Sequence, residues 1–350
     1  MAAAIVVSSP FIPPIVGAIS NAFPAEFVSI MATVVGAAVA LAVVVAVTRI
    51  RERRSWRFAG LIAAVAGAAL YARAVATGNV QTDAVEHAHF VEYGLIALLF
   101  YRAWRPLDDG RAWMWPLLAG VFVGIVDEFV QWFIPGRVGE AHDIFLNAVA
   151  VLSGLLFAVS VDAPARFALA LRDRAARPIG YGVTVVLVTF ALFVQAVHLG
   201  HEIYDPEIGV FWSGYSAADL IAASRDRAER WKTRPPVVLH PLSREDHYLS
   251  EALWHVQSRN RAWGAGDPFS AWRENRILEK FFEPVLDTAS YASRVPLRWP
   301  PDQRAQTAAR VSGDPGIYIS RAAPYPIYTW PPLAFWSAVA VIVAAVMSAC

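Results

Sequence analysis

Residues 124–147 of the chain read GIVDEFVQWFIPGRVGEAHDIFLN. The stretch begins as an apolar helix typical of a membrane span, yet it carries Asp127, Glu128 and Gln131 near the end of that helix. These positions lie one, three and four residues apart, so they share one helix face. Carboxylates at that depth are costly in lipid and normally face the bundle interior, where they have partners. The stretch therefore predicts either a hydrogen-bond cluster that joins helices or a functional site.

The composition of the whole chain indicates a membrane protein. Of the 350 residues, 57% are hydrophobic and only 17% are charged, which is too apolar for an ordinary soluble protein. The net charge of +1 gives no reason to expect a nucleic-acid partner, and we expect membrane lipids as partners and no cofactor. The one cysteine is Cys350, so no disulfide or thiol chemistry is expected within the body of the fold.

Apolar windows predict an all-α polytopic membrane helical bundle of about seven spans, because a bilayer core of ~30 Å needs ~20 apolar helical residues. The expected spans are residues 27–47, 58–77, 88–104, 112–134, 144–161, 179–200 and 332–349. Arginines cluster in the first, third and fifth connections. The positive-inside rule then predicts an N-terminus outside and a C-terminus in the cytoplasm. Lysine is scarce among the basic residues and alanine is abundant, which indicates a bacterial protein, so we expect the bacterial inner membrane.

The remaining segments complete the expected domain organisation. Residues 201–327 are polar and rich in Pro and Trp, and we expect a mostly helical periplasmic domain with helix N-caps at Ser216, Ser243 and Asp267. An aromatic belt at the membrane surface is expected from Trp212, Trp330, Trp336, Tyr325 and Tyr328. The other segments are an interfacial or re-entrant segment at 1–25, the first span with a basic loop at 26–57, a four-span core at 58–162, an amphipathic loop with the sixth span at 163–200, and a C-terminal span at 328–350.

Several polar residues from separate parts of the chain are expected at the level of the two carboxylates. They are His89 and Glu92 in the third span, Arg137 after the Pro135-Gly136 turn, and Asp143 and Asn147 at the start of the fifth span. Convergence of independently placed polar residues at one depth favours a site over helix association alone.

The same residues resemble the VanZ-like membrane family over about residues 55–162. The resemblance lies in HFVEYGLIALLFYRAW (89–104) and GIVDEFVQWFIPGR (124–137), with Gly154 beyond them. The matching positions are His89, Phe90, Tyr93, Asp127, Glu128, Gln131, Pro135, Gly136, Arg137, Asp143 and Asn147. Asp83 and Glu86 stand where the family often has an Asp-Lys pair, and Ala150 replaces a common glycine, which predicts altered helix packing. The resemblance implies a bacterial membrane protein whose family namesake lowers sensitivity to a glycopeptide antibiotic.

The residue chemistry predicts a buried, outward-facing polar site for an outer-leaflet lipid or a cell-envelope precursor. Glu128 and His89 can exchange a proton in a low-dielectric pocket, and Arg137 can hold a phosphate or carboxylate through two hydrogen bonds. The candidate catalytic residues are Glu128, His89 and Asp127, and the candidate binding residues are Arg137, Gln131, Asp143, Asn147, Tyr93 and Glu92. The absence of a recognised catalytic motif favours a binding protein over a conventional enzyme.

Two further possibilities remain open at this point. The chain can instead be a non-catalytic accessory subunit of a larger membrane complex, for example photosynthetic or respiratory, which uses the added domain and extra spans for assembly. A transporter is less favoured, because no inverted repeat is visible. Weak candidate metal ligands are His198, His201 and Glu202, and His247, Glu251 and His255, although neither set matches a known metal signature.

Overall fold

The computed structural model describes residues 2–50, 55–107, 109–164, 176–236, 244–290, 293, 296–311 and 317–350. It divides into two compact units, which we describe separately. The first unit comprises Met1–Gln131, Gly139–Phe193 and Trp336–Cys350, and the second comprises Trp132–Val138 and Val194–Phe335. Ser243 and most of the arginines expected in the first and fifth connections lie outside the described residues.

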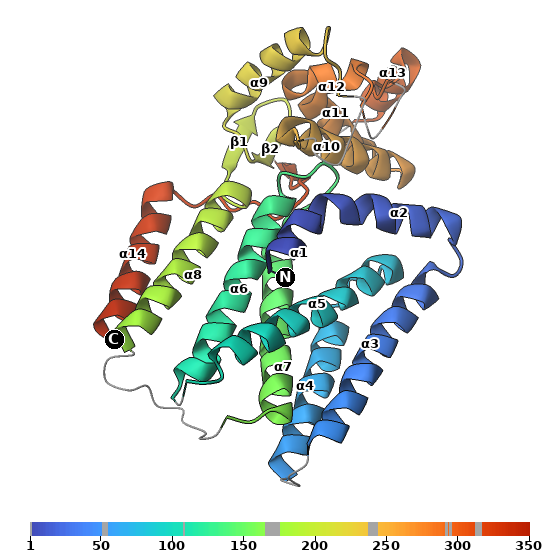
Figure 1. The fold of residues 1–350 in the computed structure, drawn as a ribbon. Coiled ribbons are helices and arrows are strands. Elements are labelled where there is room, and N and C mark those ends of the chain that lie inside the picture. The colour runs from blue at the N-terminus through green and yellow to red at the C-terminus, as the bar shows by residue number, and fades with distance from the viewer. Residues whose placement is uncertain are drawn as a thin grey trace. The chain divides into compact units, whose positions relative to one another are not determined.

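Seven helices coincide with the seven expected spans (Figure 1). They are α3 (Phe27–Arg49), α4 (Ser55–Ala74), α5 (Val80–Trp104), α6 (Arg111–Gln131), α7 (Ala141–Val161), α8 (Ala176–Val197) and α14 (Pro332–Ser348). Among the described residues, α3, α4, α6, α7 and α8 are individually long and apolar enough to cross a membrane, whereas α5 is more polar and α14 is shorter. The predicted membrane helical fold is therefore confirmed, and the number of spans agrees approximately.

Several predicted helix ends differ from the observed ends by three residues or more. Helix α5 begins at Val80 instead of residue 88, because the side chain of Asn79 caps it by accepting hydrogen bonds from the backbone N–H groups of Gln81 and Thr82. Helix α6 ends at Gln131 and α8 ends at Val197, each three residues earlier than expected. After each of these two helix ends, the chain continues with residues that belong to the second unit.

The N-terminal segment is helical but broken. Helix α1 (Ala2–Ser8), a short 3-10 turn η1 (Ser9–Phe11) and helix α2 (Ile12–Ala22) bend by 55° between Ala2–Phe11 and Pro14–Ala22. A bend of this size suits either a broken span or a re-entrant loop. Pro10 stands in the break because proline fits the first turn of a helix but not its interior. Helix α1 and η1 pack against α6.

Helices α5, α6 and α7 pack closely where glycines remove the side chain. A Cβ atom on Gly154 of α7 would lie 2.5 Å from the Cα of Gly94 on α5. On α6, a Cβ atom on Gly120 would lie 2.6 Å from Cγ1 of Val151 on α7. Small residues at such crossings let membrane helices gain van der Waals contact, since lipid supplies no hydrophobic drive for association.

Arg57 fixes the opposite end of this helix group. Its Nε donates a hydrogen bond to the backbone carbonyl of Ser160 at 2.8 Å, and its guanidinium also donates to the carbonyl of Val161. Tyr101 of α5 donates through its hydroxyl to the carbonyl of Asp162 at 2.8 Å. The carbonyls that end α7 thus receive donors from α4 and α5, which satisfies groups that a helix terminus leaves without intrahelical partners.

In its described residues, the second unit combines five helices with a sheet that was not expected from the sequence. The strands are β1 (His201–Asp205), β2 (Gly209–Ser213) and β3 (Ile319–Ser320), in the order β1-β2-β3, with β1 antiparallel and β3 parallel to β2. The helices are α9 (Ala217–Arg230), α10 (His247–Gly264), α11 (Pro268–Phe281), α12 (Glu283–Asp287) and α13 (Pro301–Arg310). The predicted caps Ser216 and Asp267 are confirmed, whereas the N-cap of α10 is Asp246.

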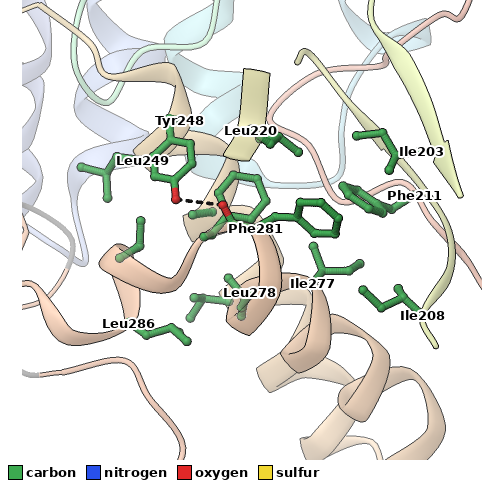
Figure 2. Close-up of a cluster of buried hydrophobic side chains, with 14 of the residues drawn as sticks. Ile203, Ile208, Phe211, Leu220, Tyr248, Leu249, Ile277, Leu278, Phe281 and Leu286 are labelled. Carbon is green, nitrogen blue, oxygen red and sulfur yellow. Dashed lines mark hydrogen bonds between the residues drawn. The ribbon is translucent and has the colours of Figure 1, made fainter. Parts of the chain in front are cut away.

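An apolar core joins the sheet and helices of the second unit (Figure 2). Phe211 of β2 and Phe281 of α11 have ring centroids 5.0 Å apart, and the Tyr248 hydroxyl donates to the Phe281 carbonyl at 2.9 Å. The chain next to α8 and α14 is also fixed, because Tyr328 donates its backbone N–H to the His198 carbonyl at 2.7 Å. The unit therefore has a core of its own.

Gly154→Val should lower the stability of the first unit. The added side chain would force α5 and α7 apart, and we expect a loss of ~3 kcal/mol in the free energy of unfolding. Thermal unfolding in detergent measures the effect. The matched control is Gly67→Val on α4, where an added Cβ meets nothing within 4 Å. Equal melting temperatures for the two variants would contradict the close-packing account.

Candidate functional site

A buried polar network lies in the first unit, where α5, α6 and α7 pack together (Figure 1). Asp127, Glu128 and Gln131 of α6 and Asn147 of α7 are each at most 4% exposed. Tyr93 of α5 is also fully buried, and His89, one turn earlier on α5, is half-buried. The sequence-predicted candidates from the third, fourth and fifth spans thus meet in one place.

Asp127 is the acceptor at one end of the network. Its Oδ1 accepts a hydrogen bond from the Ser9 hydroxyl at 2.6 Å. Its Oδ2 accepts from the Tyr93 hydroxyl at 3.1 Å and from Nε2 of Gln131 at 2.9 Å. Three neutral donors from three parts of the chain therefore surround this carboxylate, which offsets part of the cost of its removal from water.

Glu128 connects the network to His89. Its Oε1 accepts from Nε2 of Gln131 at 3.0 Å and from Nδ2 of Asn147 at 3.4 Å. Oδ1 of Asn147 in turn lies 2.7 Å from Nδ1 of His89. Because the Asn147 carbonyl can only accept, Nδ1 of His89 is the donor in this pair. A continuous hydrogen-bonded path thus runs from the half-buried imidazole to the fully buried carboxylate.

The local sequence explains how these side chains come so close. Residues 127, 128 and 131 share one face of α6, and Gly124 lies one turn earlier on that helix. A Cβ atom on Gly124 would lie 3.0 Å from the Cβ of Asn147 and 3.5 Å from Cε1 of Tyr93. Glycine therefore leaves the space in which α5 and α7 bring their polar side chains to α6.

The structure also describes three further candidate binding residues. Glu92 is half-buried on α5 beside Tyr93, and Asp143 lies in the first turn of α7. Burial raises the pKa of Glu140, which precedes α7, and the Asp143 carboxylate raises it further. Arg137 belongs to the second unit, where its backbone N–H donates to the Ile134 carbonyl at 3.0 Å.

Ser9 is a network residue that the sequence does not indicate. Its hydroxyl is 2% exposed and donates to Asp127, so the broken N-terminal segment takes part in the network. A serine before Pro10 in an apolar stretch gave no indication of a partner 118 positions away. The contact depends on how the segment folds back against α6, which local sequence does not encode.

The weak metal candidates have other partners. Nδ1 of His198 lies 2.9 Å from the Pro326 carbonyl, Glu202 accepts from Nε1 of Trp212 at 3.3 Å, and His201 is exposed at the start of β1. On α10, His247 stacks on Trp132 with ring centroids 4.1 Å apart. Within the described ranges, no group of three or more His, Cys, Asp or Glu residues is arranged to hold a metal ion.

A second buried polar group, in the second unit, connects α10 and α11. Nδ1 of His255 lies 2.6 Å from Oε2 of Glu274, and Oε1 of Glu274 accepts from the hydroxyls of Tyr318 and Ser320 at 2.8 and 2.6 Å. Although burial opposes ionisation, His255 and these hydroxyls hold the pKa of Glu274 below its usual value. The sequence analysis grouped His255 with its neighbours on α10, whereas its closest partner is on α11.

Residues 38–162, a little over a third of the chain, match the protein family described as VanZ/LLP1. This segment is therefore VanZ-like, and it contains the whole network apart from Ser9. The match begins inside α3, earlier than the expected start near residue 55. No curated protein and no solved structure matches the chain.

Asn147→Ala should destabilise the first unit and separate His89 from Glu128. The variant removes one donor and one acceptor from buried partners, so we expect a loss of ~2 kcal/mol. Thermal unfolding in detergent measures it, with Leu152→Ala as the control because Leu152 lies on the same helix and is 54% exposed. If both variants unfold at the same temperature, the path from His89 to Glu128 contributes nothing to stability.

Glu251 of α10 gives a pH-dependent prediction for the second unit. Burial raises its pKa, while His255, Ser213 and the Gly214 backbone N–H oppose the shift. A carboxyl with a raised folded-state pKa contributes stability that is complete below its unfolded value near 4.5 and is lost as pH rises through the folded value. Glu251→Gln should therefore be more stable than the wild type at pH ~7 and should lose less stability as pH rises.

Thermal unfolding of the full chain from pH ~4 to ~8 measures the difference between the two proteins. Glu229→Gln is the control, because the Glu229 side chain is 79% exposed and pairs with Lys232. Parallel pH profiles for wild type and Glu251→Gln would contradict the assignment.

Proposed function

We propose that the VanZ-like segment binds the polar headgroup of an outer-leaflet lipid or cell-envelope precursor of a bacterial inner membrane. The observation that carries the proposal is the adjacent carboxylate pair, Asp127 and Glu128, buried in a membrane helix and joined through Asn147 to the half-buried His89. Helix association needs only small residues or neutral hydrogen-bonding groups. Two buried carboxylates add a desolvation cost that association alone does not require.

The chemistry of the network suits a headgroup with hydroxyls and a phosphate. Carboxylate oxygens accept hydrogen bonds from hydroxyl groups, and an arginine guanidinium binds phosphate through two parallel donors. Asp127 and Glu128 supply the acceptors, and Arg137, six positions beyond Gln131 in the chain, supplies the guanidinium. The imidazole of His89 adds a polar group at the half-buried end of the network.

This arrangement favours binding over conventional catalysis. Asp127 and Gln131 are held by hydrogen bonds within the fold, which suits groups that bind a ligand in a fixed geometry. If the site transfers a proton, Glu128 and His89 are the pair that would do so through Asn147.

A second candidate function is an accessory subunit of a larger membrane complex. The observation that favours it is the outer face of the sheet in the second unit, where Tyr204 and Ile319 are 67% and 55% exposed and Ile317 beside β3 is 72% exposed. Exposed apolar patches on folded domains often mark interaction surfaces. Fixed co-purification with other membrane subunits would support this function over the first.

Substitutions that remove the charges should weaken headgroup binding without unfolding the chain. We expect Glu128→Gln and Arg137→Ala each to reduce the affinity for phosphatidylglycerol about tenfold, since each removes one charge-assisted contact. Native mass spectrometry of the full chain titrated with phosphatidylglycerol in detergent measures the bound fraction. Phosphatidylcholine, whose headgroup offers no hydroxyl donor, is the matched lipid, and Leu152→Ala is the matched variant. The proposal fails if wild type and both variants bind the two lipids equally.

A further inference from the structure

The loop that carries Arg137 belongs to the same compact unit as helices α9 to α13. Residues Trp132–Val138 follow Gln131 of the network directly and lie within the VanZ-like segment. Helices α10 and α11, with which the loop shares a unit, lie far beyond the end of that segment at residue 162. The contacts that this loop makes with the rest of the second unit therefore join the VanZ-like segment to residues outside that segment.

Glu245 holds two points of the loop at once. Its backbone N–H donates to the Phe133 carbonyl at 2.9 Å, and its Oε2 accepts from the Gly136 N–H at 3.2 Å. Glu245 is buried, with an exposed fraction of only 7%. A carboxylate that accepts from a backbone N–H in such a place makes a stronger hydrogen bond than a neutral acceptor does.

The backbone of the loop turns sharply at Gly136, and residues outside the loop help to fix this turn. Gly136 adopts φ of +74°, a left-handed conformation that glycine reaches without strain but does not hold by itself. The Arg137 N–H closes a tight turn by donating to the Ile134 carbonyl at 3.0 Å. Glu245 accepts a hydrogen bond from Gly136, which lies between Ile134 and Arg137 in this turn. Glu245 therefore fixes the backbone immediately before Arg137.

Contacts from three other residues hold the start of the loop. The Trp132 ring stacks on His247 at 4.1 Å with an interplanar angle of 14°, and its Nε1 donates to the Tyr325 hydroxyl at 3.4 Å. The Arg244 guanidinium lies 5.3 Å from the Phe133 ring centroid. Burial lowers the pKa of His247 to about 4, with Asp246 opposing and Arg244 reinforcing the shift, so the stacked ring is neutral near pH ~7.

We infer that the second unit is a clamp on the Trp132–Val138 loop and that Glu245 is the positioning residue that fixes Arg137 for ligand binding. The role of Arg137 in this inference rests on the proposed headgroup site, whereas the clamp itself stands on the contacts above. A guanidinium held in place loses less conformational freedom when it binds, so a fixed loop raises affinity. Release of the clamp would lower the affinity of the same site.

Hydrogen–deuterium exchange of the full chain in lipid nanodiscs tests the clamp. Glu245→Ala should accelerate exchange in peptides that cover residues 132–138 about tenfold, because it removes the acceptor of the Gly136 N–H. Glu245→Gln keeps a neutral acceptor oxygen, so its exchange should lie between that of the wild type and that of Glu245→Ala. Glu229→Ala, an exposed glutamate in the same unit, is the matched control. Tyr325→Phe removes the acceptor of Trp132 from a different segment and should accelerate exchange in the same peptides.

Acceleration confined to the loop supports the clamp. Unchanged exchange in Glu245→Ala and Tyr325→Phe overturns it, and so does equal acceleration across α10 and α11, which would show a general loss of structure. Phosphatidylglycerol titration then separates the two claims. If Glu245→Ala weakens binding and the double variant with Arg137→Ala binds no worse than Arg137→Ala alone, Glu245 acts through Arg137. If the wild type binds no lipid, the proposed function fails while the exchange result still decides the clamp.

Discussion

The burial of Asp127 and Glu128 inside a membrane helix is the constraint on which the arrangement of the first unit depends. Carboxylates removed from water must have hydrogen-bond donors, and lipid supplies none. The structure meets this need with Ser9 from the N-terminal segment, Tyr93 from α5, Gln131 from α6 and Asn147 from α7. The pair therefore requires three helices and a returning segment to meet at one level.

Close helix packing makes that meeting possible. Gly124 leaves room for Asn147 and Tyr93, and the Gly94–Gly154 crossing brings α5 and α7 together. Arg57 and Tyr101 fix the other end of α7 through its terminal carbonyls. The polar network and the close crossings support each other, because separated helices would leave the carboxylates without donors. His89 is the half-buried member of the network.

The membrane helices and most of the network can be predicted from sequence because both signals are local. Runs of apolar residues identify the spans, and polar residues such as His89 and Asn147 stand out within them. Ser9 does not stand out, because its role arises only when the chain folds back against α6. Strands β1 and β2 are only five residues each, and β2 contains Trp212, which we expected in an aromatic belt, so the sequence pattern does not indicate a sheet. The His255–Glu274 pair joins two helices, and spacing within one helix cannot predict such a contact.

The chain thus combines a VanZ-like segment with a second unit that holds one of its loops. This combination gives the second unit a role in either candidate function, as a clamp on Arg137 or as a surface for partner subunits. The most direct test of the headgroup site is extraction of the full chain from its native membrane in mild detergent, followed by native mass spectrometry. Our account predicts that the chain retains a lipid or envelope precursor whose headgroup carries phosphate and hydroxyl groups. A fixed set of other membrane subunits, with no such molecule retained by the chain, would contradict it.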